Sequence, residues 1–98
     1  MSSALPPIRA LSKSLKELRV HMSQNSPASR GLRDFIIKSY PGLKEANPGL
    51  PILIREASGV ESRIIARFEL GRERKIVVDN LGVSDVEQKF NALVSEAK

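Results

Sequence analysis

The sequence predicts an α/β domain built from a mixed four-stranded sheet and two main helices, in the order strand, helix, strand, strand, strand, helix. Apolar and polar residues alternate over residues 15–22 and 63–70, which predicts strands with one buried face. Apolar residues recur at intervals of three and four within residues 26–40 and 83–94, which predicts two amphipathic helices. The length of 98 residues, with 41% apolar residues, suits one domain with one core.

Residues 1–14 are expected to form a flexible basic arm ahead of a single domain over residues 15–98. Pro6 and Pro7 disfavour regular structure, and no acidic residue precedes Glu17. This composition fits a mitochondrial targeting segment and also fits a disordered terminus. The arm has no continuous apolar stretch, which argues against a secretory signal.

The first strand is predicted over residues 15–22. Leu18, Val20 and Met22 share one face with the aliphatic stem of Lys16, and the charged or polar residues between them share the other. Ser26 followed by Pro27 then predicts a helix start, because serine caps free backbone N–H groups and proline suits the first helical position.

The first helix is predicted to carry its apolar stripe through Leu32, Phe35, Ile36 and Tyr40. Gly31 lowers helix stability by about 1 kcal/mol relative to alanine, so it indicates close packing. Pro41 is expected to break or kink this helix near Tyr40.

The next three strands follow without a helix between them. The run Ile52-Leu53-Ile54 within residues 51–56 is typical of a strand buried in a parallel sheet. Residues 63–70 alternate, with Leu70 on the core face, and Gly71-Arg72 is expected to form a hairpin turn to a partner strand over residues 75–79.

The last helix is predicted to begin with a capping box, in which Ser84 caps and Glu87 reaches back. Its core stripe comprises Val83, Val86, Phe90, Leu93 and Val94. A right-handed parallel crossover followed by an antiparallel hairpin gives a thioredoxin-like arrangement. The two alternating strands also predict an open second sheet face, which would show Arg19, His21, Arg63 and Arg67 beside Ile65.

The composition excludes several classes of chemistry. The absence of cysteine rules out a disulfide scaffold, a thiol nucleophile, an iron–sulfur cluster and a cysteine-ligated zinc site, and there is one histidine. A thioredoxin-like core places redox chemistry in the loop after its first strand, but here that loop has no thiol. Apolar runs reach only three or four residues, which is too short for a membrane-spanning segment. No glycine-rich nucleotide-binding motif is present, so nucleotide binding is not indicated.

The excess of basic residues lies in the first half of the chain. Residues 1–50 carry eight basic and three acidic residues, whereas residues 51–98 carry eight of each, so the whole net charge of +5 lies before residue 51. This asymmetry suits an acidic protein, nucleic acid or anionic lipid as partner, and it also fits an ordinary protein of a basic proteome. All four aromatic residues fall on predicted core stripes, which leaves no stacking platform for RNA.

Two local features have both a functional and a structural interpretation. Ser26, Ser29, Arg30 and Arg33 gather at the start of the first helix, where they suit either an anion site or simple capping beside a solvated basic face. His21 has no second histidine or cysteine nearby, which favours a structural or solvated side chain over a metal ligand.

Two motifs carry a resemblance to a known family. They are S-P-x-S-x-G-x-R-D-F-I at residues 26–36 and K-x-A-N-P-x-L-P-I-L-I-R-E at residues 44–56. With them, residues 15–95 resemble the small thioredoxin-like accessory subunits of mitochondrial complex I, the NADH:ubiquinone oxidoreductase, known as alpha-subcomplex subunit 2. The first motif also resembles mitochondrial ribosomal proteins with the same domain, so a ribosomal protein contacting rRNA is the alternative.

The resemblance implies a non-catalytic subunit without cofactor or metal. Such a subunit lies on the matrix side of the inner membrane, without inserting into it, in the NADH-oxidising region of the peripheral arm and against the large iron–sulfur subunit. Animal members carry cysteines at the positions of Ser23 and Ala57, so thiol-based regulation does not carry over to this chain. No nucleic acid is expected as partner.

No catalytic, cofactor-binding or metal-binding residue is expected, and the candidate site is a protein contact. The helix start, the end of the second strand and the open sheet face are the three candidate surfaces. Ser26, Arg30, Arg33 and Arg55 are the predicted contact residues. An Arg33→Glu change is expected to weaken retention in the complex while the isolated domain stays folded.

Overall fold

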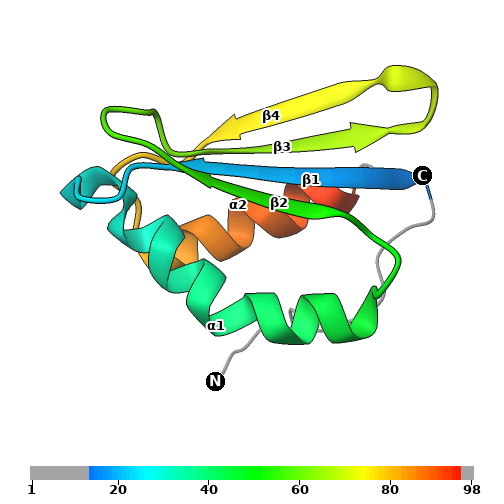
Figure 1. Cartoon of the computed structure of the whole chain (residues 1–98), viewed down its shortest axis with the longest axis horizontal. Coiled ribbons are helices and arrows are strands. Elements are labelled where there is room, and N and C mark those ends of the chain that lie inside the picture. The colour runs from blue at the N-terminus through cyan, green and yellow to red at the C-terminus, as the bar shows by residue number, and fades with distance from the viewer. Residues whose placement is uncertain (1–13, 96–98) are drawn as a thin grey trace.

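Two helices cover one face of a four-stranded sheet (Figure 1). The computed structural model of the chain describes residues 14–95. The elements, in chain order, are β1 (Leu15–Met22), the 3-10 helix η1 (Pro27–Ser29), α1 (Arg30–Ala46), β2 (Ile52–Glu56), β3 (Arg63–Phe68), the 3-10 turn η2 (Glu69–Gly71), β4 (Glu73–Val77) and α2 (Val83–Ser95). The strand order is β2-β1-β3-β4, with β1 and β2 parallel and the other pairs antiparallel. The α/β class, the mixed four-stranded sheet and the two main helices are therefore confirmed.

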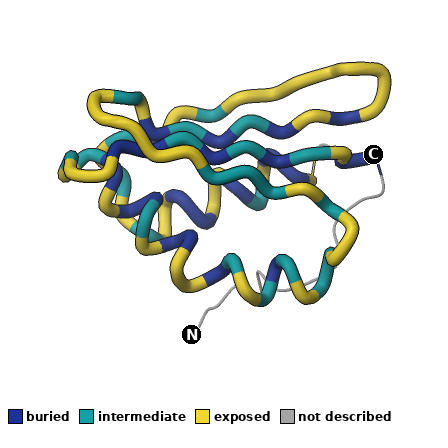
Figure 2. The backbone as a smooth tube through the Cα atoms, in the orientation of Figure 1, coloured by how far each residue is buried: buried dark blue, intermediate teal, exposed yellow. Residues whose placement is uncertain are grey.

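The core lies between the sheet and the two helices, where Figure 2 shows most of the buried chain. The central strands β1 and β3 supply Leu18, Val20, Ile64, Ala66 and Phe68. The helices supply Leu32, Phe35, Leu43, Val86, Phe90 and Leu93. The rings of Phe35 and Phe90 lie 5.2 Å apart and join α1 to α2. Fully burying one such side chain contributes about 1.5–3 kcal/mol, so this layer dominates the stability of the fold.

Helix α1 begins as predicted but does not stop at Pro41. The side chain of Ser26 accepts a hydrogen bond from the Ala28 N–H at 3.1 Å, and Pro27 opens the 3-10 turn that leads into the helix. Beyond Pro41 the helix continues to Ala46. Pro41 has no N–H to donate to the Ile37 carbonyl, and Figure 1 shows the helix axis changing direction along its length. Of the two predicted effects, the break is therefore wrong, because one lost hydrogen bond bends a packed helix without ending it.

A bulge changes the first strand near its start. Strand β1 spans the predicted residues, but its register with β3 shifts between Leu15 and Glu17. Leu15 is buried, and Lys16 is exposed. The prediction that the Lys16 stem shares the core face is therefore wrong, because the extra residue in the bulge interrupts the alternation.

Strand β2 is an edge strand and is only half-buried. Ile52, Leu53 and Ile54 are all of intermediate exposure, because within residues 14–95 they have a strand, β1, on one side only. The predicted strand and its parallel pairing are therefore confirmed, whereas its expected burial is wrong. An apolar run of three residues does not distinguish a central strand from an edge strand.

The β3–β4 hairpin turns earlier than predicted. Strand β3 ends at Phe68 and β4 begins at Glu73, so the tight turn comprises Leu70 and Gly71 instead of Gly71 and Arg72. Leu70 is fully exposed and adopts a φ of 63°. Its predicted place on the core face is wrong, because the turn removes it from the alternating strand.

Helix α2 begins two residues earlier than the predicted cap at Ser84 implies. It starts at Val83, and the Val86 N–H donates to the Gly82 carbonyl at 3.0 Å, which makes Gly82 the cap. Ser84 lies inside the first turn, so the proposed capping box is wrong. Val86, Phe90, Leu93 and Val94 are buried as expected, whereas Val83 is partly buried against the core.

Candidate functional site

The second face of the sheet is open, as the alternation predicted. In β1, Arg19 and His21 point away from the helices, between Leu53 and Arg55 of β2 and Ile65 and Arg63 of β3. None of these residues is buried, although both helices pack on the opposite face (Figure 1). We call this surface, comprising Glu17, Arg19, His21, Leu53, Arg55, Arg63, Ile65 and Arg67 with the neighbouring Glu73, Lys75 and Val77, the open face.

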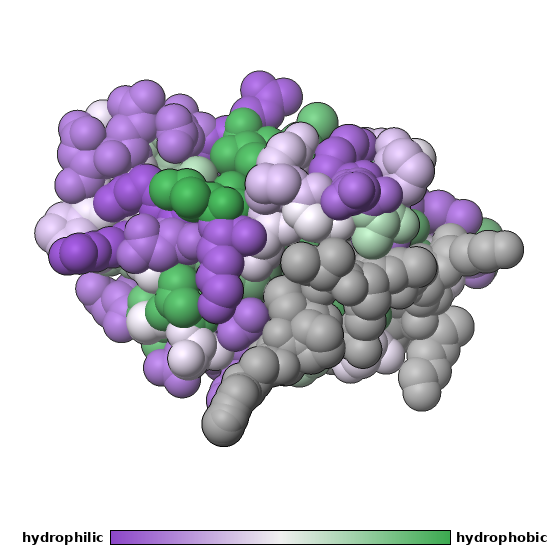
Figure 3. All heavy atoms as spheres, turned by 90° about the horizontal axis from the view of Figure 1, so that it is seen from below, coloured by the Kyte–Doolittle hydropathy of each residue, from purple (hydrophilic) through white to green (hydrophobic). Residues whose placement is uncertain are grey.

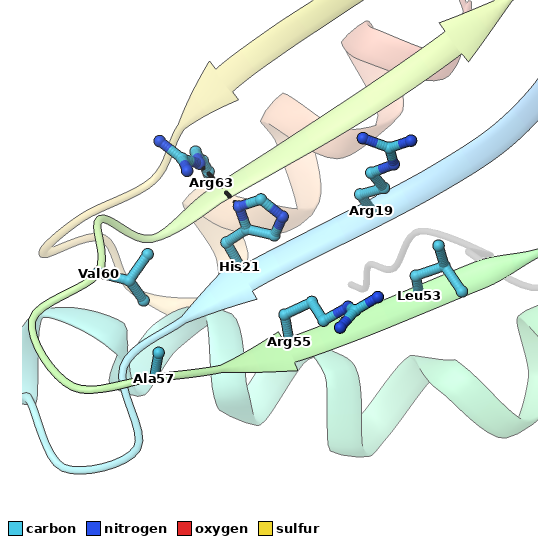
Figure 4. A pocket seen from close by; sticks show the side chains of 7 residues that line it. All are labelled: Arg19, His21, Leu53, Arg55, Ala57, Val60 and Arg63. Atoms are coloured by element: carbon cyan, nitrogen blue, oxygen red, sulfur yellow. Dashed lines mark hydrogen bonds between the residues drawn. The ribbon is translucent and has the colours of Figure 1, made fainter.

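A shallow hollow of about 540 Å³ lies at one end of the open face. Figure 4 shows side chains from three strands and the β2–β3 loop around it. Its lining comprises Arg19, His21, Leu53, Arg55, Ala57, Val60 and Arg63. Three guanidinium groups therefore share one depression with an imidazole and a few apolar side chains. The three arginines come from three separate segments of the chain. The pairing of the strands brings them together in two neighbouring rows of the sheet.

His21 contributes a hydrogen-bond donor to this hollow. The Nε of Arg63 donates to the Nδ1 of His21 at 2.9 Å, as the dashed line in Figure 4 shows. Only a neutral imidazole can accept a hydrogen bond there, and the proton of that neutral ring then lies on Nε2. Burial lowers the pKa of His21 below its usual value, and the positive charges of Arg63, Arg19 and Arg55 lower it further. His21 is therefore neutral near pH 7.

The charge on the open face is balanced at one end and unbalanced at the other. Glu17 lies 3.2 Å from the Nε of Arg19 and 3.6 Å from an Nη of Arg67, and Glu73 lies opposite Arg67 in the sheet, so two carboxylates offset these two arginines. Glu61 lies 3.4 Å from Arg63. The side chain of Arg55 has no ion pair or hydrogen bond among residues 14–95, and it is exposed. The hollow therefore carries a net positive charge.

The four predicted contact residues fall on two separate surfaces. Ser26, Arg30 and Arg33 lie at the start of α1, whereas Arg55 lies on the open face. Arg33 donates from Nη1 to the Ser23 carbonyl at 2.9 Å, and Arg30 is exposed beside a second shallow hollow. Ser26 and Arg33 both make hydrogen bonds within the chain, which shows that both side chains support the backbone at the helix start.

A buried group of hydroxyls at the same end was not foreseen as a unit. Ser29 accepts a hydrogen bond from the Ser23 N–H at 2.9 Å, and its hydroxyl contacts that of Ser62. The Ser62 N–H donates to Asp79 at 3.0 Å. Ser29 and Ser62 are separated by 33 residues, so no local sequence signal could connect them. The group ties α1 to the β2–β3 loop and to the residues after β4.

Ser23 and Ala57, the positions where the resemblance implies cysteines in animal members, lie close together. The Ala57 N–H donates to the Met22 carbonyl at 3.2 Å, which places Ser23 and Ala57 at neighbouring strand ends. Hydroxyl and methyl groups cannot form a disulfide. Within residues 14–95 no three His, Cys, Asp or Glu residues are grouped to hold a metal ion. Nor is any helix in that range long and apolar enough to cross a membrane.

Comparison with known proteins gives a consistent family. A model of the "Mitochondrial ribosomal protein L51 / S25 / CI-B8 domain" matches residues 32–82. The chain is 44% identical to "NADH dehydrogenase [ubiquinone] 1 alpha subcomplex subunit 2" of Mus musculus over 83% of this chain and 82% of the relative. It is 46% identical to the protein of the same name from Arabidopsis thaliana, over 87% of this chain and 88% of the relative.

Two further relatives show that the chain is more similar to complex I subunits than to a ribosomal protein. The chain is 39% identical to the "NADH-ubiquinone oxidoreductase 10.5 kDa subunit" of Neurospora crassa, over 87% of this chain and 90% of the relative. Similarity to the "Large ribosomal subunit protein mL43" of Mus musculus is lower, with 24% identity over 45% of that protein. The chain therefore belongs to the family of NADH dehydrogenase [ubiquinone] 1 alpha subcomplex subunit 2 proteins, within the L51 / S25 / CI-B8 domain group.

Proposed function

We propose that this protein is an accessory subunit of mitochondrial complex I, on the matrix side of the inner membrane. It docks on the peripheral arm near the NADH-oxidising region, with the large iron–sulfur subunit as its main partner, and it supports assembly or stability. The observation that carries this proposal is the near full-length match to complex I subunits of an animal, a plant and a fungus, at 39–46% identity.

The side-chain chemistry supports a docking role without catalysis. The chain has no cysteine, and its single histidine accepts a hydrogen bond from Arg63. The hydroxyls of Ser29 and Ser62 are buried and contact each other. A serine nucleophile needs an adjacent base and access to substrate, and these buried hydroxyls have neither.

Two surfaces support docking. The open face offers three arginines around a hollow, and the start of α1 offers exposed Arg30 with half-buried Arg33. Figure 3 views the helix side, where apolar groups form small patches among hydrophilic ones. Ile37, on α1, is an exposed apolar residue. We place the main contact on the open face because three arginines gather there around one hollow, and the Arg55 side chain has no ion pair within residues 14–95.

Native co-migration tests the proposal. The epitope-tagged chain is expressed in the cells that produce it, and mitochondrial membranes are separated on a native gel stained for NADH dehydrogenase activity. We expect the tag in the active complex I band, and we expect loss of the gene to reduce that band. Migration of the tag with the large ribosomal subunit would refute the proposal and support the ribosomal alternative.

A further inference from the structure

We propose that the open face binds an acidic, amphipathic segment of a partner protein. Its carboxylates pair with Arg19, Arg55 and Arg63, and its apolar side chains pack on Leu53 and Ile65. The inference rests on the proposed function only in naming the partner as another subunit of complex I. The chemistry of the segment follows from the open face itself.

The strand register builds a surface with two kinds of rows. In one row Leu53, Arg19 and Ile65 lie side by side across β2, β1 and β3. In the next row Arg55, His21 and Arg63 follow in the same order. In-register neighbours in a sheet have Cβ atoms about 4.5–5.5 Å apart, so each row is continuous. A row with two apolar side chains on either side of an arginine therefore lies next to a row with two arginines, which matches a segment that mixes apolar and acidic side chains.

The basic row attracts carboxylates from outside the chain. Arg55 makes no ion pair within residues 14–95, and Arg63 shares Glu61 with Lys75, whose Nζ lies 4.0 Å from that carboxylate. The neutral His21 ring offers an Nε2–H donor and no competing charge. Arginine forms bidentate hydrogen bonds with carboxylates, and these pairs are stronger than neutral hydrogen bonds. At the opposite end of the face Glu17 and Glu73 offset Arg19 and Arg67, so we place the partner's acidic residues over the hollow.

The same face is a poor surface for RNA. Single-stranded RNA is held by stacking its bases on exposed aromatic side chains. Phe35, Phe68 and Phe90 are buried, and Tyr40 packs against the core from the helix layer. The open face presents Leu53 and Ile65 where a base platform would need aromatic rings. A protein segment is therefore the occupant that both the charge and the apolar side chains favour.

A photo-crosslinking experiment in the assembled complex tests this inference. Benzoylphenylalanine replaces Leu53 in one tagged variant and exposed Lys89 of α2 in a control, and the crosslinked segments are identified by mass spectrometry after purification of complex I. We expect the Leu53 probe to capture a segment rich in Asp and Glu. Capture of a neutral or basic segment, capture of RNA, or no capture from an assembled subunit would overturn the inference.

Charge reversal supplies an independent measurement. Arg55→Glu and the control Lys89→Glu change the net charge equally, and the Arg55 side chain has no partner to lose within residues 14–95. We expect Arg55→Glu to lower the amount retained in purified complex I by about tenfold or more, because a buried interfacial charge is left facing carboxylates. Arg55→Lys is expected to retain an intermediate amount. Equal retention of all three variants would overturn the inference.

The two proposals can fail separately. If the wild-type chain joins complex I and Arg55→Glu joins equally well, the proposed function stands and the inference fails. If the wild-type chain does not join complex I, the proposed function fails, and the purified chain is titrated with a short peptide of alternating Glu and Leu. Binding that Arg55→Glu reduces about tenfold would then support the inference, and equal binding would overturn it.

Discussion

Gly31 of α1 lies directly against the backbone that precedes α2. A Cβ atom built at Gly31 would lie 1.9 Å from the Leu81 carbonyl oxygen and 2.9 Å from its carbonyl carbon. Both are backbone atoms, so they cannot rotate away as the end of a side chain could. The sequence indicated close packing at Gly31, and the structure identifies the neighbour.

We therefore expect Gly31→Ala to destabilise the fold, although alanine is the better helix former. Alanine gains about 1 kcal/mol from helix propensity at an unobstructed site, but overpacking against backbone here lowers the free energy of unfolding by about 2–3 kcal/mol. Urea unfolding measures the change. Gly49→Ala is the control, since a Cβ there meets nothing within 4 Å. An increase in stability for Gly31→Ala would contradict the close contact.

Two fully buried serines provide a matched comparison of satisfied and unsatisfied hydroxyls. Ser29 bonds to the Ser23 N–H and contacts the Ser62 hydroxyl, whereas Ser39 has no partner for its Oγ among residues 14–95. We expect Ser29→Ala to lower the free energy of unfolding by about 1–3 kcal/mol, because it leaves two buried groups unpaired. Ser39→Ala should be neutral or stabilising. Thermal and urea denaturation of both variants measures the difference, and equal losses would contradict this assignment.

His21 makes stability depend on pH. Its pKa is lowered in the folded state, so the unfolded chain binds the proton more readily. We expect the free energy of unfolding to be fully retained above about pH 6.5 and to fall as the pH drops from there toward the folded-state pKa. His21→Gln should lose this component, as judged by urea midpoints at several pH values. If the free energy of unfolding falls equally with falling pH in the wild type and in His21→Gln, His21 is not the group responsible.

The element that departs most from local preference is the β3–β4 hairpin. Leu70 and Gly71 both have positive φ values, of 63° and 75°, and the Arg72 N–H donates to the Glu69 carbonyl at 3.3 Å. Two consecutive positive φ values are the pattern of a type I′ turn, which favours Asn-Gly. Leucine at the first position is strained and has no compensating burial.

We expect Leu70→Asn to raise the free energy of unfolding by about 1 kcal/mol, because asparagine tolerates the left-handed conformation. Thermal denaturation of the purified chain measures the gain. Leu70→Ala keeps a Cβ at the same φ and should give no comparable gain. If Asn and Ala behave alike, the positive φ at Leu70 is not the cause of the cost.

At the scale of the whole molecule, the lack of a helix on one sheet face creates the candidate site. Figure 1 shows α1 and α2 on the same side, and no described element covers Arg19, His21 or Arg63. A sheet with a bare face exposes every second side chain of its central strands. In this chain three of those side chains are arginines, Arg19, Arg63 and Arg67, so the sheet face without a helix layer is a basic surface.

The charge distribution along the chain was an incomplete guide to this surface. The net positive charge lies wholly in residues 1–50, yet Arg55 and Arg63 come from the half whose charges cancel. The strand register brings Arg19 next to residues 53–65, whereas most acidic residues lie elsewhere in the molecule. Basic and acidic residues whose charges cancel along the sequence are therefore separated in space. Residues 1–13, the greater part of the predicted basic arm, lie outside the described residues.

The sequence by itself determined the order and type of the elements, the stripes that form the core, and the open face of the sheet. These follow from residue periodicity, which is a local property that each segment carries alone. The tertiary structure decided the turn at Leu70, the bulge at Lys16, the edge position of β2 and the serine group around Ser29. It also decided that Arg55 and Arg63 lie on either side of His21. Such contacts depend on the pairing of strands that are distant in the sequence, and no local sequence pattern predicts that pairing.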